Sequence, residues 1–178
     1  MAQSAWVGMV RAVNVGGTGK LPSTELAAAC RAVGMTEVKT YLASGNVVFL
    51  TSMSETGIAS VMEMALSKIL GKPTTVLLRT EAGLRDALAR NPFADCEPSR
   101  TLIYFLPEAA DTNTVPSATG RKNEEIAAGG REIFVHYPDG IGESRLRIPA
   151  AQRGTARNLN TVRKLADMAC ALDASRAR

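Results

Sequence analysis

The segment of residues 14–20, with sequence NVGGTGK, has the glycines and the lysine that an anion-binding loop requires. Backbone N–H groups of such a loop, together with the positive end of a following helix, attract negative charge. A phosphate-binding P-loop has glycine six residues before the lysine and serine or threonine directly after it. Asn14 and Leu21 occupy those two positions, and the GxGxxG spacing of dinucleotide-binding loops is absent as well. The segment therefore predicts either a general anion site or a tight connection that packs on a neighbouring hairpin.

Two further groups in the first half could contribute to such a site. Arg11 lies in an apolar segment, residues 6–13, where an unpaired buried charge would be costly. Strand alternation places Arg11 on the same face as Met9 and Val13, so we expect it to be paired or to face outward. Residues 44–46, Ser-Gly-Asn, predict a turn first and a ligand site second, because no GxSxG frame surrounds the serine and no helix follows it.

In the second half, the polar clusters at residues 142–147 and 155–161 are the remaining candidates. The second cluster lies at a predicted helix start, where Thr155 or Asn158 could act as the cap. Capping explains one of its polar residues and leaves the others for a ligand or for a joint with the first half. No catalytic residue is predicted. The predicted ligand-binding residues are Arg11, Asn14, Gly16, Gly17, Lys20, Ser44, Asn46, Arg145, Arg157, Asn158 and Asn160.

Neither a metal nor a cofactor is predicted. The chain has one histidine and three widely spaced cysteines, which do not form the ligand pattern of a zinc site. His136 lies in a predicted strand and is expected to form structural hydrogen bonds. Asp139 and Glu143 share a glycine-containing loop but do not match the spacing of a calcium loop. Cys30 and Cys170 fall on apolar helix faces and predict small buried thiols.

The net charge of +4, from 21 basic and 17 acidic residues, is unevenly distributed. Residues 141–164 contain six basic residues and one acidic residue, which predicts either a strip that meets phosphates or a solvated face. Aromatic residues make up only 4% of the chain, which weighs against the stacking of nucleic-acid bases. Nucleic acid is therefore the less favoured partner, and an anionic small molecule is the preferred one.

Composition indicates an ordinary globular protein, with 46% hydrophobic and 21% charged residues. No apolar run approaches the ~18 residues that span a bilayer. The short apolar run at residues 5–10 lacks the preceding basic region of a signal peptide. We therefore expect a cytoplasmic protein with no membrane partner, and its oligomeric state is not predicted.

The first half predicts an α+β fold of the ferredoxin-like type, with strands and helices in the order βαββαβ. The sheet order is then fourth, first, third, second, and all neighbouring strands are antiparallel. The predicted elements are a strand at 6–13, a helix from about 22 to 34, a hairpin at 38–42 and 47–50, a helix at 55–70 and a strand at 74–78. This topology brings three loops to one edge of the sheet, residues 14–20, 44–46 and 71–72.

The second half predicts a less regular α+β arrangement packed against the first. Its predicted elements are a helix at 80–90, a strand at 101–106, a hairpin at 124–128 and 132–137, and a helix from about 158 to 172. We expect residues 173–178 to be frayed. The predicted subdomains are residues 1–79, ferredoxin-like, and residues 80–178, a second α+β subdomain that ends in a C-terminal helix.

Five motifs resemble, in order and spacing, those of the bacterial family catalogued as domain of unknown function 1697. They are RAVNVGG, TYLASGNVVF, NPF, HYPDGIGESRL and TARNLNTVRKL, and the resemblance covers residues 9 to about 172. The family usually has glycine where Ala12 stands, an aromatic residue where Leu159 stands and lysine where Arg145 stands. The resemblance implies a cytoplasmic α+β protein with ferredoxin-like halves, and it implies no activity, cofactor or catalytic residues.

These observations favour a binding protein or small enzyme that acts on an anionic, phosphate-bearing small molecule. Its site would lie at the edge formed by the glycine loop and the hairpin tip. Two alternatives stay open, a nucleic-acid-binding module that uses the basic strip, and a structural or oligomerising module without a ligand. Whether the protein is an enzyme is left undecided by the sequence.

Overall fold

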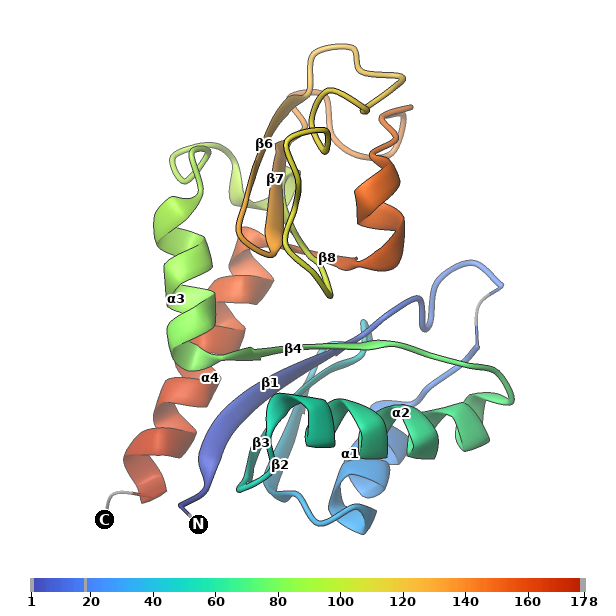
Figure 1. Ribbon diagram of the computed structural model, residues 1–178, viewed down its shortest axis with the longest axis vertical. Coiled ribbons are helices and arrows are strands. Elements are labelled where there is room, and N and C mark those ends of the chain that lie inside the picture. Colours follow the sequence, from blue (N-terminus) through green and yellow to red (C-terminus); the bar gives the residue numbers. More distant parts are fainter. Residues whose placement is uncertain (1, 18, 177–178) are drawn as a thin grey trace. The chain divides into compact units, whose positions relative to one another are not determined.

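The computed structural model describes residues 2–17 and 19–176, and the chain forms two compact units (Figure 1). The first unit comprises Met1–Leu84 and Lys164–Arg178, and the second comprises Arg85–Arg163. Each unit contains one four-stranded antiparallel sheet. The predicted α+β class is therefore confirmed.

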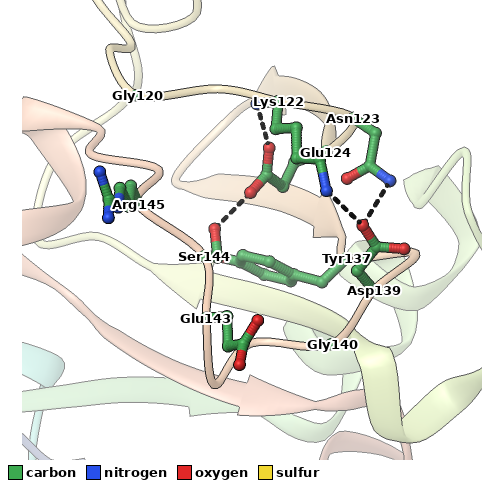
Figure 2. A pocket seen from close by; sticks show the side chains of 10 residues that line it. All are labelled: Gly120, Lys122, Asn123, Glu124, Tyr137, Asp139, Gly140, Glu143, Ser144 and Arg145. Carbon is green, nitrogen blue, oxygen red and sulfur yellow. Dashed lines mark hydrogen bonds and ion pairs between the residues drawn. The ribbon is translucent and has the colours of Figure 1, made fainter.

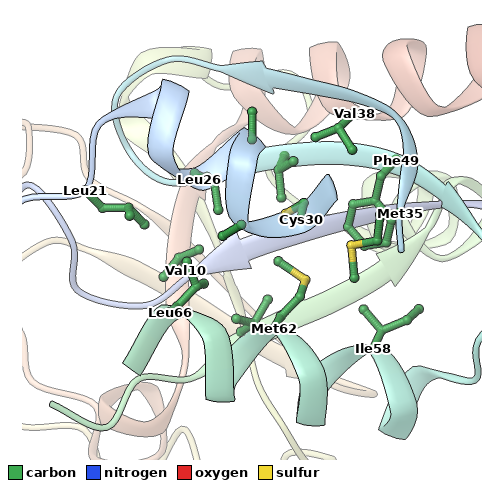
Figure 3. Packing of buried hydrophobic residues seen from close by; sticks show 14 of the residues in the cluster. Val10, Leu21, Leu26, Cys30, Met35, Val38, Phe49, Ile58, Met62 and Leu66 are labelled. Carbon is green, nitrogen blue, oxygen red and sulfur yellow. The ribbon is translucent and has the colours of Figure 1, made fainter. Parts of the chain in front are cut away.

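The sheet of the first unit has the order β2-β3-β1-β4, which is the predicted order read from the other edge. Its elements are β1 (Ser4–Val10), α1 (Ser23–Ala32), β2 (Thr36–Tyr41), β3 (Asn46–Thr51), α2 (Glu55–Leu70) and β4 (Val76–Thr80). Both helices pack on the sheet through one core, in which Leu26 and Cys30 of α1 and Ile58 and Met62 of α2 surround Phe49 of β3 (Figure 3). Fully burying a side chain of this size contributes about 1.5–3 kcal/mol.

Local sequence sets the ends of these two helices. The Ser54 hydroxyl accepts a hydrogen bond from Gly57 N (3.2 Å) at the start of α2, and Gly71, with φ of 67°, ends that helix. α1 starts after Pro22, and no side chain of the described residues caps it. Gly34 follows the end of α1 with φ of 92°.

The sheet of the second unit has the order β6-β7-β5-β8. Its strands are β5 (Thr101–Phe105), β6 (Glu125–Gly129), β7 (Glu132–His136) and β8 (Thr155–Asn158), with short 3-10 helices at Pro98–Arg100 and Pro149–Arg153. The predicted hairpin is confirmed as β6 and β7, joined around Gly130. The prediction missed β8 and placed Thr155 in a helix start, because a four-residue strand is too short to show a two-residue period beside a long helical pattern.

Helices α3 (Glu81–Arg90) and α4 (Leu159–Arg176) each contribute residues to both units. The expected fraying is wrong for residues 173–176, because α4 continues to Arg176 and Ala5 N donates to Asp173 Oδ1 (3.1 Å). Residues 177 and 178 lie outside the described residues. The contact of Ala5 with Asp173 lies within the first unit. The units therefore differ from the predicted subdomains 1–79 and 80–178, since the C-terminal part of α4 belongs with β1.

The cysteines differ in their surroundings. Cys30 is buried, as predicted, and burial raises the pKa of its thiol to about 12. Cys170 is exposed on α4, so its predicted burial is wrong. The buried stripe of α4 passes through Leu165, Ala169 and Leu172, and Cys170 lies one helical step away from that stripe. Among the described residues, no helix is long and apolar enough to cross a membrane.

Candidate functional site

The loops predicted to share one edge of the first sheet do meet there. Asn14 Nδ2 donates to the Ala43 carbonyl of the hairpin (2.6 Å). Arg11 N donates to Thr75 O (2.9 Å), which joins the end of β1 to the segment before β4. We call this region the glycine-loop edge and define it by three segments, which are residues 11–20 without residue 18, residues 42–46 and residues 70–75.

Asn14 uses its whole side chain to shape this edge. Besides its bond to Ala43, Nδ2 donates to Leu21 O (2.8 Å), and Oδ1 accepts from Leu21 N (2.8 Å). Asn14 N also donates to Gly19 O (3.1 Å), and asparagine tolerates the left-handed φ of 56° observed here. These contacts hold the loop against the hairpin, so Asn14 positions the predicted site through its structure.

The hairpin tip requires glycine, whereas the loop presents glycine to solvent. Gly45 has φ of 81°, and a Cβ atom there would lie 2.7 Å from Val13 Cγ2. Val10 N donates to Gly45 O (2.9 Å), so the tip packs directly on the end of β1. Gly16 and Gly17 have φ values of 21° and 80°, with open space where a side chain would stand. Their backbone is therefore accessible to a ligand.

Three cationic side chains belong to this edge. Arg11 was predicted to lie inside the first strand, but β1 ends at Val10 and Arg11 lies in the turn that follows. Its side chain is half-buried there. Lys20 is exposed, and Lys72 Cε lies 3.5 Å from where a Cβ atom on Gly19 would stand. The three segments of the edge contain no aspartate or glutamate. Lys72 is absent from the predicted ligand residues, although the topology predicted that residues 71–72 would reach this edge.

Ser44 and Asn46 stabilise the hairpin turn itself. Asn46 is fully buried, and its Nδ2 donates to Tyr41 O (3.0 Å) and to Ser44 Oγ (2.8 Å). A buried amide with these partners fixes the turn conformation. The structure therefore gives both residues a turn role, as the sequence suggested first.

The other predicted residues lie in the second unit and do not form one cluster. Arg157 is 7% exposed in β8 and donates from one terminal nitrogen to Thr155 Oγ1 (2.7 Å) and Ala156 O (2.8 Å). Burial lowers the pKa of Arg157 to about 10, which leaves it protonated at neutral pH. Asn158 Oδ1 accepts from Thr161 N (3.0 Å) and caps α4, and Asn160 is exposed in the first turn of that helix.

Arg145, in contrast, lines a cavity of about 190 Å³ in the second unit (Figure 2). We call this cavity the Tyr137 pocket. Its walls come from the segment before β6 and from the loop after β7, and they consist of Gly120, Lys122, Asn123, Glu124, Tyr137, Asp139, Gly140, Glu143, Ser144 and Arg145. Of these ten residues, only Arg145 is among the ligand-binding residues predicted from the sequence. The motif HYPDGIGESRL supplies six of these ten residues, and it is the sequence feature that could have predicted this pocket.

Hydrogen bonds hold two carboxylates of the pocket in the ionised form. The buried Glu124 accepts from Ser144 Oγ and from Lys122 N (2.6 Å), and the hydroxyl donor followed by the amide lowers the pKa of its carboxyl group. Asp139 Oδ2 accepts from Lys122 Nζ (3.2 Å) and Asn123 Nδ2 (3.0 Å), and these two bonds lower the pKa of Asp139. Both groups carry a negative charge at neutral pH.

Tyr137 connects this pocket to a second cavity of about 230 Å³, which is lined by Tyr104, Tyr137, Leu146, Arg147, Ile148, Ala151 and Gln152. The Tyr104 and Tyr137 hydroxyls form a hydrogen bond of 2.7 Å. Burial raises the pKa of both phenols, and the bond to Tyr104 raises that of Tyr137 further. Both tyrosines are therefore neutral hydrogen-bonding groups at physiological pH.

The basic segment of residues 141–164 does not form a continuous exposed strip. Arg157 is buried, and Arg153 forms an ion pair with Glu108 (3.1 Å). Phe49, which could offer a base-stacking surface on β3, is fully buried in the core of the first unit. One arginine of the basic segment is thus buried and another is ion-paired, and Phe49 is not accessible to a base.

His136 has the structural role predicted for it. Its Nδ1 lies 3.2 Å from Thr101 Oγ1, and its ring centroid lies 6.4 Å from that of Phe93. Within residues 2–17 and 19–176, no group of three or more histidine, cysteine, aspartate or glutamate side chains could hold a metal ion.

Comparison with protein families identifies the chain. The family model described as "Protein of unknown function (DUF1697)" matches residues 3–134, which is most of the sequence. The chain belongs to this family. The match includes the glycine-loop edge and the segment before β6, whereas the motif of residues 136–146 follows the matched range. No curated protein matches the chain.

Among solved structures, the fold is similar to that of the conserved bacterial protein SP0830 from Streptococcus pneumoniae. The TM-score is 0.77 and the sequence identity is 22%, over 94% of this chain and 99% of that one. At this identity the similarity establishes a shared fold. The two proteins thus share the α+β architecture over nearly the full length of both chains.

Proposed function

We propose that the glycine-loop edge binds an anionic, phosphate-bearing small molecule. The observation that carries this proposal is that the segments bearing Arg11, Lys20 and Lys72 meet at an edge whose three segments contain no acidic residue. Cationic side chains attract anions even near the surface, and helix N-termini and exposed backbone N–H groups are recurrent phosphate sites.

The backbone of the edge supports the same ligand class. Gly16 and Gly17 leave their peptide groups accessible, and turn conformations of this kind can direct N–H groups toward an anion. The N-terminus of α1 follows Lys20 closely and has no side-chain cap among the described residues. Its first N–H groups can therefore donate to a ligand, and the helix dipole favours negative charge at this end.

The side chains that fix the loop make the site preorganised. The three Asn14 side-chain hydrogen bonds and the packing of Gly45 on Val13 determine the loop position before any ligand arrives. Preorganisation reduces the entropy cost of binding, so a modest number of charged contacts is enough for micromolar affinity.

A thermal-shift titration with inorganic phosphate, AMP and glucose 6-phosphate tests this proposal. At a hundredfold excess of ligand over the dissociation constant, binding stabilises the native state by about 2.7 kcal/mol. We expect at least one of these probes to raise the melting temperature of the wild type and to act much less on Lys20→Ala and Lys72→Ala. Glucose is the uncharged control for glucose 6-phosphate.

Arg31→Ala is the matched control variant. Arg31 lies in the last turn of α1, at the far end of the helix from Lys20. A helix of ten residues is about 15 Å long, which exceeds the screening length of about 8 Å at physiological salt. Equal ligand-induced shifts in Lys20→Ala, Lys72→Ala and Arg31→Ala would refute a site at this edge. A response to single-stranded RNA but to none of the small anions would favour a nucleic-acid module in its place.

A further inference from the structure

The Tyr137 pocket lies in the second unit and takes no part in the proposed anion site. Its charge pattern differs from that of the glycine-loop edge. The pocket contains the acidic residues Glu124, Asp139 and Glu143 together with the basic residues Lys122 and Arg145. Acidic groups outnumber basic ones, so a phosphate would meet three carboxylates here, and like charges at this range repel.

Several of these groups remain available to a ligand. Both hydrogen bonds to Asp139 use Oδ2, so its Oδ1 can accept another hydrogen bond. Among the described residues, the Glu143 carboxylate and the Arg145 guanidinium have no hydrogen-bond or ion-pair partner. Figure 2 shows Arg145 at one side of the pocket, beside Gly120, and Asp139 at the opposite side, with the Tyr137 ring between them.

The wall that carries Arg145 is firmly held. Thr119 and Arg147 pair through two backbone hydrogen bonds (2.9 and 2.8 Å). Gly120, with φ of 67°, lies so close to the loop after β7 that a Cβ atom would stand 2.1 Å from Arg145 O. The buried Glu124 accepts from Ser144 Oγ and thereby ties the segment before β6 to the loop after β7. The charged groups therefore project from a preorganised frame, as a binding site requires.

We propose that the Tyr137 pocket binds a small zwitterion of the size of an α-amino acid. The ligand ammonium group would lie between Asp139 and Glu143, and its carboxylate would accept hydrogen bonds from Arg145, a geometry that guanidinium groups favour. An apolar side chain would lie on the Tyr137 ring. A volume of about 190 Å³ is several times the ~30 Å³ share of one water molecule, so it accommodates a ligand of this size.

The alternatives fit the same groups less well. A simple anion would leave Glu143 without a counter-charge and the free Oδ1 of Asp139 without a donor, and a simple cation would be repelled by Arg145. A zwitterion supplies both charges and satisfies all three groups together. This inference is independent of the proposed anion site, because it uses different residues in the other unit.

The test is an amide-shift titration of the full chain by NMR with the free L-α-amino acids, one at a time. We expect at least one of them to shift the amide signals of residues 137–145 saturably, while the signals of residues 11–20 stay in place. The N-acetyl derivative and the carboxamide of that amino acid, which each lose one charge, should bind at least about tenfold more weakly, as the loss of one charge-assisted hydrogen bond predicts.

Variants distinguish the two charged ends. Arg145→Gln should weaken binding of the free amino acid about tenfold but change the affinity for its carboxamide little. Glu143→Gln should likewise weaken binding of the free amino acid about tenfold but change the affinity for its N-acetyl derivative little. Both side chains are exposed, so neither change should unfold the protein. Arg153→Gln, which alters an arginine outside the pocket, is the control. The proposal is overturned if no amino acid shifts residues 137–145 at millimolar concentration, or if the N-acetyl derivatives and carboxamides bind as well as the free forms.

Discussion

The glycine-loop edge and the Tyr137 pocket differ in how they are built. The edge consists of backbone turns that the topology of the first sheet brings together, and its two lysines, Lys20 and Lys72, are exposed to solvent. The pocket is a cavity between two loops, and it is held by side-chain hydrogen bonds such as that of Ser144 to Glu124. Turn residues and sheet topology therefore allow a site to be located from the sequence, whereas a cavity depends on contacts between residues far apart in sequence.

The largest expected effect concerns the frame of the pocket. Gly120→Ala should lower the free energy of unfolding by about 3 kcal/mol or more, because its φ of 67° disfavours a side chain and the new Cβ atom would lie 2.1 Å from Arg145 O. Gly140→Ala has the same kind of φ, 84°, but open space, and should lose only about 1 kcal/mol. Urea denaturation measures both. Similar losses in the two variants would show that the contact with Arg145 does not hold the pocket.

The next effect concerns the frame of the edge. Asn14→Ala removes the hydrogen bonds to Leu21 and Ala43 and should destabilise the protein by about 2 kcal/mol. Lys20→Ala, at an exposed position of the same loop, should stay within about 0.5 kcal/mol of wild type while it weakens anion binding. Urea denaturation without ligand separates the two roles. A stability loss in Lys20→Ala as large as that in Asn14→Ala would contradict the different roles given to these residues, in which Asn14 holds the loop in place and Lys20 attracts the anion.

The stability that the Glu124 carboxylate gives to the Tyr137 pocket should depend on pH. The folded pKa of Glu124 lies below its unfolded value because Ser144 and the Lys122 amide donate to the carboxylate. The stability from this carboxylate is therefore present above the unfolded pKa of about 4.3 and is lost as the pH falls through the folded pKa. Ser144→Ala should cost about 1.5 kcal/mol at pH 7 and progressively less below pH 4. Urea denaturation from pH 7 to pH 3 tests this, and a cost that does not change with pH would contradict it.

The smallest expected effect is a gain in stability. Ala12 has a left-handed φ of 50°, which a residue with a Cβ atom rarely adopts. Ala12→Gly should therefore raise the free energy of unfolding by about 1 kcal/mol, less the extra entropy that glycine gives the unfolded chain. Urea denaturation of Ala12→Gly beside Ala43→Gly, at an exposed hairpin residue without this φ, measures the difference. A loss of stability in Ala12→Gly would show that the loop does not strain this residue.

Much of the fold and one shared edge were predictable from sequence. Helix α2, with Ser54 at its start and Gly71 at its end, follows from the periodicity and the capping residues, and the strand order follows from the βαββαβ pattern. The hairpin tip followed from Gly45 and Asn46. These features are decided by neighbouring residues, which a single sequence displays directly.

The rest depended on long-range contacts. β8 is defined by its pairing with β5, and α4 extends to Arg176 because Asp173 accepts a hydrogen bond from β1, so local patterns could not reveal either feature. Of the predicted ligand residues, Asn46 and Arg157 are buried and hydrogen-bonded to residues close to them in the chain. A polar residue in an apolar context predicts that it has a partner, but it does not say whether that partner is a ligand or the protein.

The anion site at the glycine-loop edge is tested most directly by an amide-shift titration of the wild type and Lys20→Ala with inorganic phosphate, AMP and glucose 6-phosphate, judged on the probe that stabilises the wild type most. The proposed function predicts saturable shifts for residues 15–17 and 19–21 and for residues 71–75 of the wild type, with a dissociation constant at least about tenfold weaker in Lys20→Ala. Shifts that spare these residues, or that are the same in both proteins, would contradict the assignment of the glycine-loop edge as an anion site.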